Sequence, residues 1–358
     1  MQQRLTHIDI ARGIGILLVV AGHNWIVLAS KGELYRMVYS FHIPLFFILA
    51  GTFFNSSKSF GVTLKERFQA LLIPYFFTSI VVEIIALAFN FDLGLFIKSV
   101  EWVFYGTGTQ MRWVAFWFLT HLFLVSIFSW LVLNIFKKYN LRRLWQILTL
   151  LTLLTVGWLS IRSFWKMPVW GMKVNGLPFS ADLLLISSFY FMLGVLSQSQ
   201  IKEREFRVMP LILLSALFFG IHALTDVTTD LNLRLYNNFI VATILAIIGS
   251  FVVIEVSKYL ARFAIAEKVL GYFGRYSLVI LIFHSFFQDN LFVFLSEYTK
   301  RFFYVGLATF TAAIVGSILV VEIINRVRPL QTIYKIPRPI RKSTFYILLS
   351  ISSVIHAM

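Results

Sequence analysis

The stretch that decides the fold is Val241–Ile254, which reads VATILAIIGSFVVI and carries no charged side chain. Leu148–Thr155 is a second stretch of the same kind. Continuous apolar runs are typical of helices that cross a bilayer, whereas the strands of a membrane barrel alternate between lipid and lumen. Within lipid every backbone polar group needs a partner, and a helix supplies one inside the segment. The sequence therefore predicts an all-α integral membrane protein.

The composition of the whole chain supports this prediction. The 358 residues are 59% hydrophobic and 13% charged, with a mean hydropathy of +0.81. Soluble domains are about a quarter charged, and one soluble core does not hide so much apolar surface. The sequence contains no cysteine, which excludes disulfides, a thiol nucleophile and thiolate metal sites, and we expect no metal cofactor.

Apolar runs separated by polar residues predict a polytopic bundle of about ten transmembrane helices. The expected spans are 8–29, 36–55, 70–90, 113–134, 144–161, 181–198, 208–225, 238–257, 277–294 and 302–323. We expect residues 1–335 to form one membrane domain. Residues 336–358 are expected to be a basic C-terminal segment with a short apolar tail.

The placement of Lys and Arg predicts a cytoplasmic N-terminus, because positive charge collects in cytoplasmic loops. With this orientation, 21 of the 32 basic residues fall in inside segments and 10 fall in outside loops, while Arg12 lies within the first span. Topology and contact with lipid headgroups therefore explain the net charge of +16, and we expect no nucleic-acid partner.

Ionisable residues within membrane spans are costly and are candidates for function. Arg12 and His23 lie in the first expected span, and the helical period places them on nearly the same face, about 16 Å apart along the axis. Asp9 precedes Arg12 by three residues and is positioned to orient it. Each residue alone fits a structural role, with Arg12 reaching lipid phosphate and His23 packing. As a pair on one face they favour a functional role.

The second expected span contains the segment Ser40–Gly51, which reads SFHIPLFFILAG. His42 is expected near the same depth as His23. Pro44 permits a kink that lines a cavity, and Gly51 permits close approach of another helix. The alternative is an ordinary kinked span with an interfacial histidine.

Other polar residues in the expected spans form a second tier of candidates. Supporting partners of the catalytic residues, or ligands of the substrate, are expected among Asp9, Glu83, His121 and His284. An interfacial position is expected for Asp182, Glu255 and Glu322, and no functional role is expected for His7, His222 and His356. The aromatic outer loop Ser163–Trp170 fits an interfacial belt, with stacking on sugar rings as the alternative.

Five stretches of the chain resemble one known family. They are Ile8–Ile16 with Ala21-Gly22-His23, Phe41–Phe47 with Ala50-Gly51, Lys65–Phe68 with Leu71–Tyr75, Trp117-Phe118-Leu119, and Gly274–Ser277 with His284. In this order they are similar to the motifs of the acyltransferase 3 family of membrane-bound acyltransferases. The second stretch resembles the fucose 4-O-acetylase branch. The last differs from the family pattern in the order Tyr276-Ser277 and in lacking a second tyrosine.

The resemblance implies transfer of an acyl group from cytoplasmic acyl-CoA, usually acetyl-CoA, to a hydroxyl of a carbohydrate or lipid-linked glycan acceptor. Coenzyme A carries several phosphates, and Arg12, Lys65 and Arg67 are expected to bind them at the inner mouth. The resemblance also implies a multi-pass protein of the bacterial cytoplasmic membrane.

A neutral imidazole is a suitable general base for a hydroxyl that attacks a thioester. We therefore expect His23 to be the base, or else a nucleophile that forms an acyl-imidazole. His42 is expected to orient the acceptor or to stabilise the developing oxyanion.

A transporter or flippase of lipid-linked sugars is the alternative function, since it also needs many helices with buried polar residues. Transporters often contain inverted repeats and paired broken helices, whereas this sequence indicates one break, at Pro44. A scaffold or channel leaves the pairing of Arg12 with His23 unexplained. Binding of acyl-CoA distinguishes the enzyme from both alternatives.

Overall fold

The computed structural model describes residues 5–30, 32–169, 171–203 and 205–335. These residues form two compact units. The first unit takes in residues 5–30, 205–208 and 253–335, and the second takes in residues 32–203 and 209–252. The C-terminal segment predicted at 336–358, and with it His356, lies outside the described residues.

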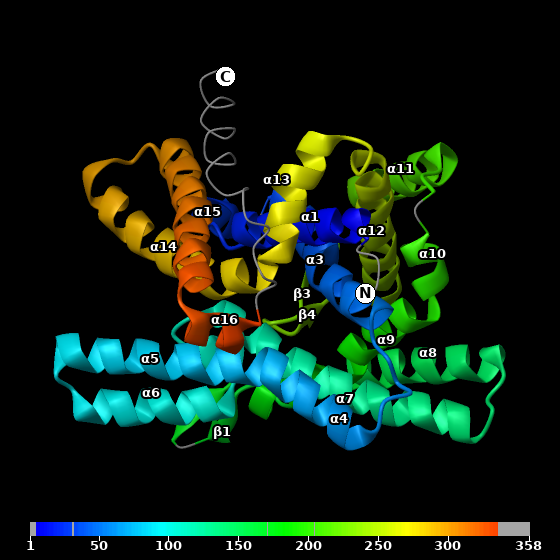
Figure 1. Ribbon diagram of the computed structural model, residues 1–358, viewed down its shortest axis with the longest axis horizontal. Helices are drawn as coiled ribbons and strands as arrows, with labels where there is room; N and C mark the ends of the chain where they lie inside the picture. The colour runs from blue at the N-terminus through cyan, green and yellow to red at the C-terminus, as the bar shows by residue number, and fades with distance from the viewer. Residues whose placement is uncertain (1–4, 31, 170, 204, 336–358) are drawn as a thin grey trace. The chain divides into compact units, whose positions relative to one another are not determined.

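The first unit is built from helices at the two ends of the described chain. These helices are α1 (Thr6–Gly22), α2 (Trp25–Ser30), α13 (Ala264–Arg275), α14 (Ser277–Tyr298), α15 (Phe302–Arg326) and α16 (Arg328–Tyr334). The long helices α14 and α15 lie side by side, joined by a short turn (Figure 1). Helix α1 packs along α13.

Glycines set the approach of α1 to α13. A Cβ atom at Gly13 would lie 2.0 Å from the carbonyl oxygen of Leu270. A Cβ atom at Gly274 would lie 1.7 Å from the carbonyl oxygen of Asp9. Any larger residue at either position would push the two backbones apart, because the obstacle is main chain. The two glycines therefore fix α13 against the half of α1 that carries Asp9.

The second unit contains the central part of the chain. Its longer elements are α3 (Glu33–Thr52), α4 (Phe60–Arg67), the π-helix η1 (Phe68–Leu72), α5 (Ile73–Asn90), α6 (Leu93–Tyr105), α7 (Trp117–Lys138), α8 (Arg143–Ser160), α9 (Leu184–Leu196), α10 (Gln198–Lys202) and α11 (Val208–Leu224). Helix α12 (Phe239–Leu260) begins in this unit, and the boundary between the units falls within it.

Short elements occupy the connections of the second unit. They are the 3₁₀-helices η2 (Gly108–Gln110), η3 (Val114–Phe116) and η4 (Pro178–Leu183), and the antiparallel strand pairs β1 (Met167–Val169) with β2 (Met172–Val174) and β3 (Thr229–Asp230) with β4 (Leu235–Tyr236). The β1–β2 hairpin packs on Trp102 and Tyr105 through Val174.

The predicted role of Gly51 in close helix packing is confirmed. A Cβ atom at Gly51 would lie 1.9 Å from the carbonyl oxygen of Phe191 in α9. In return, a Cβ atom at Gly194 would lie 2.0 Å from the carbonyl oxygen of Ile48 in α3. Helix α3 is continuous through Pro44, so the helix break predicted at this residue is wrong.

The membrane character of the fold is confirmed. Eight of the described helical segments are long and apolar enough to cross a bilayer: Glu33–Thr52, Phe60–Phe89, Val114–Lys138, Arg143–Ser160, Pro178–Leu196, Phe239–Leu260, Ser277–Tyr298 and Phe302–Arg326. The shorter apolar helix Val208–Leu224 matches a ninth expected span. Large apolar side chains such as Ile84 and Ile85, each about half exposed, face outward from these helices. Lipid accommodates such a surface, so the chain is an all-α membrane bundle.

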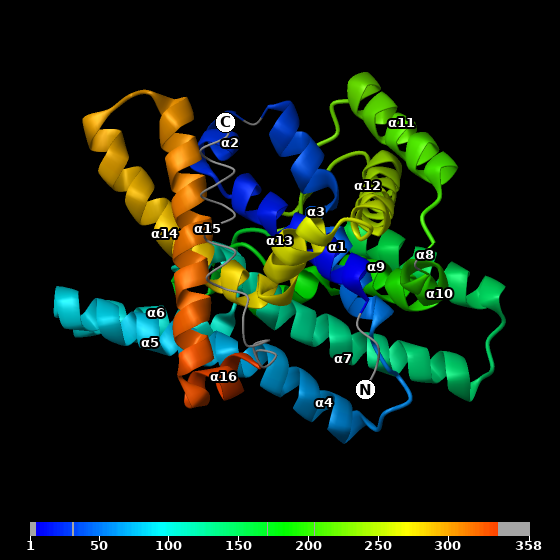
Figure 2. The ribbon, with the colours of Figure 1, turned by 45° about the horizontal axis from the view of Figure 1, so that its top comes forward.

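Two details differ from the expected spans. The first span, predicted as one helix over 8–29, is broken between α1 and α2, and neither helix is among the described segments that are long and apolar enough to cross a bilayer. The predicted loop after α5 contains α6, which Asp92 caps by accepting a hydrogen bond of 2.8 Å from the backbone N–H of Leu95. Figures 1 and 2 show α6 lying alongside α5. With 13 residues, α6 is shorter than a full membrane span, so hydropathy alone did not identify it.

Candidate active site

The break after α1 lies at His23 and Asn24. His23 is the last residue of the helical turn, with its backbone N–H donating to the carbonyl of Val19 at 2.9 Å. Asn24 Oδ1 then accepts from the backbone N–H of Ile26 at 3.1 Å, which is the N-cap arrangement that starts a new helix. The side chain of Asn24 therefore begins α2, and His23 lies at the junction of the two helices.

Helix α15 holds this break in place. The Asn24 Nδ2 group donates to the carbonyl oxygen of Gly306 at 2.9 Å and to Thr309 Oγ1 at 3.2 Å. Beside it, the indole N–H of Trp25 donates to Asp289 Oδ1 of α14 at 2.9 Å. Backbone that leaves the helical path at membrane depth is tolerated where it lines a cavity or is buried in protein.

His284 of α14 lies against His23. The two ring centroids are 5.3 Å apart with an interplanar angle of 73°, an edge-to-face contact. Nδ1 of His284 lies 3.0 Å from the carbonyl of Ile280 and 2.9 Å from that of Leu281. Because carbonyls only accept, Nδ1 carries the proton and donates, which fixes the ring beside His23. The structure thus brings together two of the predicted site residues.

Arg12 and Asp9 lie on α1, on the side of His23 toward the helix start. Nη1 of Arg12 is 4.0 Å from Oδ1 of Asp9, a long ion pair between a buried carboxylate and a partly exposed guanidinium. Arg275 ends α13 directly after Gly274, the residue that contacts the backbone of Asp9. A second guanidinium therefore lies at the same end of α1, and the sequence had marked Arg275 only as a motif residue.

Lys65 and Arg67 belong to the second unit, in the last turn of α4. The guanidinium of Arg67 lies 5.0 Å from the ring centroid of Phe54, within reach of a cation–π interaction. The π-helix Phe68–Leu72 follows directly. Such π-turns occur frequently at functional sites, so the position of these two cations is consistent with a functional role.

His42 lies in the interior of the second unit on α3. Its Nδ1 donates to the carbonyl of Val38 at 2.8 Å, and its ring contacts Tyr39 edge to face at 4.8 Å. Tyr39 lies against Tyr35 with centroids 4.1 Å apart, and the Tyr35 hydroxyl donates to Asp230 Oδ2 at 3.0 Å. His42 therefore ends a row of three contacting rings along one face of α3.

Glu83 forms a bidentate ion pair with Arg112, a partner that the sequence did not indicate. Nε of Arg112 donates to Oε1 and Nη2 donates to Oε2, both at 3.0 Å. These hydrogen bonds raise the pKa of Arg112 above its ordinary value. Hollows of about 180 and 250 Å³ flank the pair, and Trp113 and Phe116 line the larger one.

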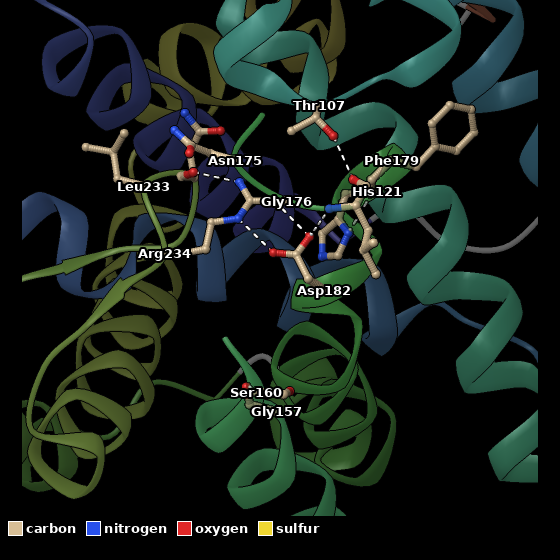
Figure 3. A network of polar contacts seen from close by, with 12 residues as sticks. Thr107, His121, Gly157, Ser160, Asn175, Gly176, Phe179, Asp182, Leu233 and Arg234 are labelled. Atoms are coloured by element: carbon tan, nitrogen blue, oxygen red, sulfur yellow. Dashed lines mark hydrogen bonds and ion pairs between the residues drawn. The ribbon is translucent and has the colours of Figure 1, made fainter. Parts of the chain in front are cut away.

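His121 takes part in a buried polar network around Asp182 and Arg234, shown in Figure 3. Its Nδ1 donates to the carbonyl of Phe179 at 3.2 Å, so its Nε2 accepts from the Ser187 hydroxyl at 2.8 Å. Both nitrogens are therefore engaged within the fold, and the residue is completely buried. This arrangement suits a positioning role better than a reacting one.

The centre of that network is an ion pair within the protein. Arg234 donates from Nε to Asp182 Oδ2 at 2.8 Å and from Nη2 to Oδ1 at 2.9 Å. Its Nη1 donates to the carbonyl of Asn232 at 2.7 Å, and the backbone N–H of Leu177 donates to Asp182 Oδ1 at 2.9 Å. A Cβ atom at Gly176 would lie 1.9 Å from Nη2, so this glycine covers the pair.

The two other carboxylates expected at span ends also have partners. Glu322 pairs with Arg326 at 3.0 Å near the end of α15, where the arginine is largely exposed. Glu255 pairs with Lys258 at 2.7 Å near the end of α12, and both side chains are largely buried.

His222, for which the sequence suggested no role, contacts two residues of α3. Its Nε2 lies 3.3 Å from Ser40 Oγ and its Nδ1 lies 3.5 Å from Glu33 Oε1. A Ser–His–Glu series invites comparison with hydrolases. However, Ser40 is completely buried and its hydroxyl donates to the carbonyl of Met37 at 2.8 Å. The series therefore fastens α11 to α3.

Comparison with known proteins identifies one family. A family model described as an acyltransferase domain matches residues 5–326. No curated protein and no solved structure matches the chain. Among the described residues, no group of three or more His, Asp or Glu side chains is arranged to hold a metal ion.

Proposed function

We propose, since this chain belongs to the acyltransferase 3 family, that it transfers an acyl group, acetyl in the first instance, from cytoplasmic acyl-CoA to a hydroxyl of a sugar or glycan precursor. The chain is a multi-pass membrane acyltransferase. The observation that carries the finer proposal is the contact of His23 with His284 at the break after α1. An imidazole at a break between two helices, where the backbone leaves the helical path, is in a position to meet a substrate.

The reaction needs one proton acceptor and one electrophile. His23 removes the proton of the acceptor hydroxyl while the oxygen attacks the thioester carbonyl carbon. The C–S bond then breaks, the ester remains on the acceptor, and the departing thiolate takes the proton from the His23 imidazolium. His284, fixed by its two backbone carbonyls, orients the ring of His23. In the alternative mechanism, His23 first attacks the thioester and carries the acyl group as an acyl-imidazole, and the hydroxyl then attacks that intermediate.

Cations bind the phosphates of the acyl donor in this proposal. Arg12 and Arg275 lie at one end of α1 in the first unit. Lys65 and Arg67, which the sequence predicted for the same role, belong to the second unit. Guanidinium groups bind phosphate through paired hydrogen bonds, which suits coenzyme A. His42 is proposed, as the sequence suggested, to orient the acceptor or to stabilise the oxyanion.

The proposed setting is the bacterial cytoplasmic membrane, with the N-terminus in the cytoplasm. The predicted excess of Lys and Arg in inner segments supports this orientation. Acyl-CoA is cytoplasmic, so this orientation puts Arg12 on the side from which the donor arrives. Membrane lipid and a carbohydrate or lipid-linked glycan are the other proposed partners.

The test is turnover of radiolabelled acetyl-CoA by the purified protein in detergent. Label that moves to a glycan, or slowly to water, supports the enzyme. Arg12→Ala is expected to raise the KM for acetyl-CoA about tenfold or more with little change in kcat, because it removes a charge-assisted contact made before the chemical step. Arg301→Ala, at the predicted outer side, is the matched control. No binding and no turnover with any short acyl-CoA would favour a transporter or flippase instead.

A further inference from the structure

Gln288 of α14 is a buried amide without a partner. Its side chain is 0% exposed, and neither Nε2 nor Oε1 has a hydrogen-bond partner among the described residues. A primary amide offers two donors and one acceptor, and burial without partners forfeits their hydration. An apolar side chain of similar size would avoid that loss. A buried unpaired amide therefore points to a ligand that supplies the missing hydrogen bonds.

The position of Gln288 follows from its neighbours along α14. Residues four apart share one face of a helix, so His284, Gln288 and Phe292 form a stripe. His284 contacts the ring of His23, and Phe292 stacks on Trp25 with ring centroids 5.7 Å apart. His23 closes α1 and Trp25 begins α2. Gln288, between the two contacts, therefore faces the break in the first helix.

Besides His23, the polar side chains of the break, Asn24 and Trp25, have partners within the unit. Asn24 donates to Gly306 and Thr309, and Trp25 donates to Asp289. These hydrogen bonds attach the residues of the break to α14 and α15. The amide of Gln288, together with His23, is therefore left for a ligand.

The direction of α1 separates a donor side from an acceptor side. Arg12 lies about 16 Å before His23 along the helix axis, and Gln288 lies one turn, about 6 Å, beyond His284 in the direction of Trp25. Gln288 and Arg12 are therefore on opposite sides of His23. If the phosphates of the donor are bound at Arg12 and the acyl group reaches His23, Gln288 lies on the acceptor's side of His23.

We propose that Gln288 binds the hydroxyl acceptor, and this inference rests on the proposed acyl transfer. Oε1 accepts a hydrogen bond from one hydroxyl while Nε2 donates to the oxygen of its neighbour. Such paired contacts select a sugar or polyol with adjacent hydroxyls, because an acceptor that lacks one of them leaves the amide unpaired.

The experiment uses membranes of the source organism in which the native gene is deleted and replaced by wild type or by a variant. These membranes contain the natural acceptor. With radiolabelled acetyl-CoA, label in carbohydrate and label released as acetate are measured separately. Gln288→Leu is expected to lower carbohydrate labelling at least tenfold and to change acetate release less than twofold. Gln288→Met repeats the test if the leucine variant folds poorly, and Asn290→Leu on the exposed side of α14 is the matched control.

The outcomes distinguish the two proposals. Equal losses of labelling and acetate release, a raised KM for acetyl-CoA, or unchanged labelling in a folded Gln288 variant would each overturn the role of Gln288 while leaving acyl transfer standing. Wild-type membranes that neither label carbohydrate nor release acetate would overturn the proposed function and this inference with it.

Discussion

Two buried polar clusters, one in each unit, differ in whether their polar atoms have hydrogen-bond partners within the protein. In the second unit, both oxygens of Asp182 and all three guanidinium nitrogens of Arg234 are paired. In the first unit, His23 and His284 meet at a broken helix, and Gln288 beside them has no partner within the described residues. The Asp182–Arg234 pair satisfies its own polar atoms without a ligand, whereas the amide of Gln288 does not.

Because of this difference, we expect substitutions in one cluster to lower stability and substitutions in the other to lower activity. Removing one member of a closed ion pair leaves an uncompensated buried charge and damages the fold. Removing a group that is unpaired in the free protein costs the fold little, and its loss is felt when a substrate is bound. Substitutions in the two clusters should therefore affect different measurements.

The largest effect on stability is expected from Asp182→Asn. The substitution removes the carboxylate charge and leaves Arg234 buried without a counter-charge, which costs about 3–5 kcal/mol. The thermal unfolding midpoint in detergent should fall by at least about 5 °C. Glu66→Gln, which removes the carboxylate of an exposed ion pair with Lys58, is the matched control and should change the midpoint little. Equal shifts for the two variants would contradict the distinction.

A smaller loss is expected from Gly176→Ala. The residue has φ +105°, and its new Cβ atom would lie 1.9 Å from Nη2 of Arg234. Backbone strain and displacement of the guanidinium together should cost about 2–3 kcal/mol. Gly171→Ala tests strain alone, because Gly171 also has a positive φ, +75°, but has open space around it. If the two variants unfold at the same temperature, the contact with Arg234 contributes nothing.

The smallest stability effect is expected from Asn24→Ala in the first unit. Loss of the N-cap of α2 should cost about 1 kcal/mol. The same change frees the break from Gly306 and Thr309, so acetyl-CoA turnover should fall more than the unfolding midpoint does. Asn290→Ala, at an exposed position of α14, serves for comparison. A stable variant with full turnover would show that the position of the break is unimportant.

The transmembrane helices could be predicted because their signal is local. A continuous apolar run such as Val241–Ile254 identifies a span without any knowledge of its neighbours. The break after α1 could not be predicted, because Asn24 is held by Gly306 and Thr309, more than 280 positions away. Helix α6 was missed because it is too short for the length criterion.

The sequence predicted several residues of the candidate site, but it did not predict which of them contact one another. His23 and His284 were identified separately, as ionisable residues in apolar runs, and the structure supplies their contact. Glu83 was identified without Arg112. Gln288 was missed because it carries no charge, and only ionisable residues stood out within the apolar runs. Its burial without a partner among the described residues sets it apart.

The measurement that tests the central claim most directly is acetyl-CoA turnover per folded molecule of His23→Gln beside wild type. If His23 is the general base, turnover should fall about 100- to 10,000-fold while the unfolding midpoint stays close to that of wild type. His222→Gln, the same substitution at a buried histidine that fastens two helices, should keep its turnover per folded molecule within about threefold. A His23→Gln protein that retains more than about a tenth of the wild-type turnover would contradict the account.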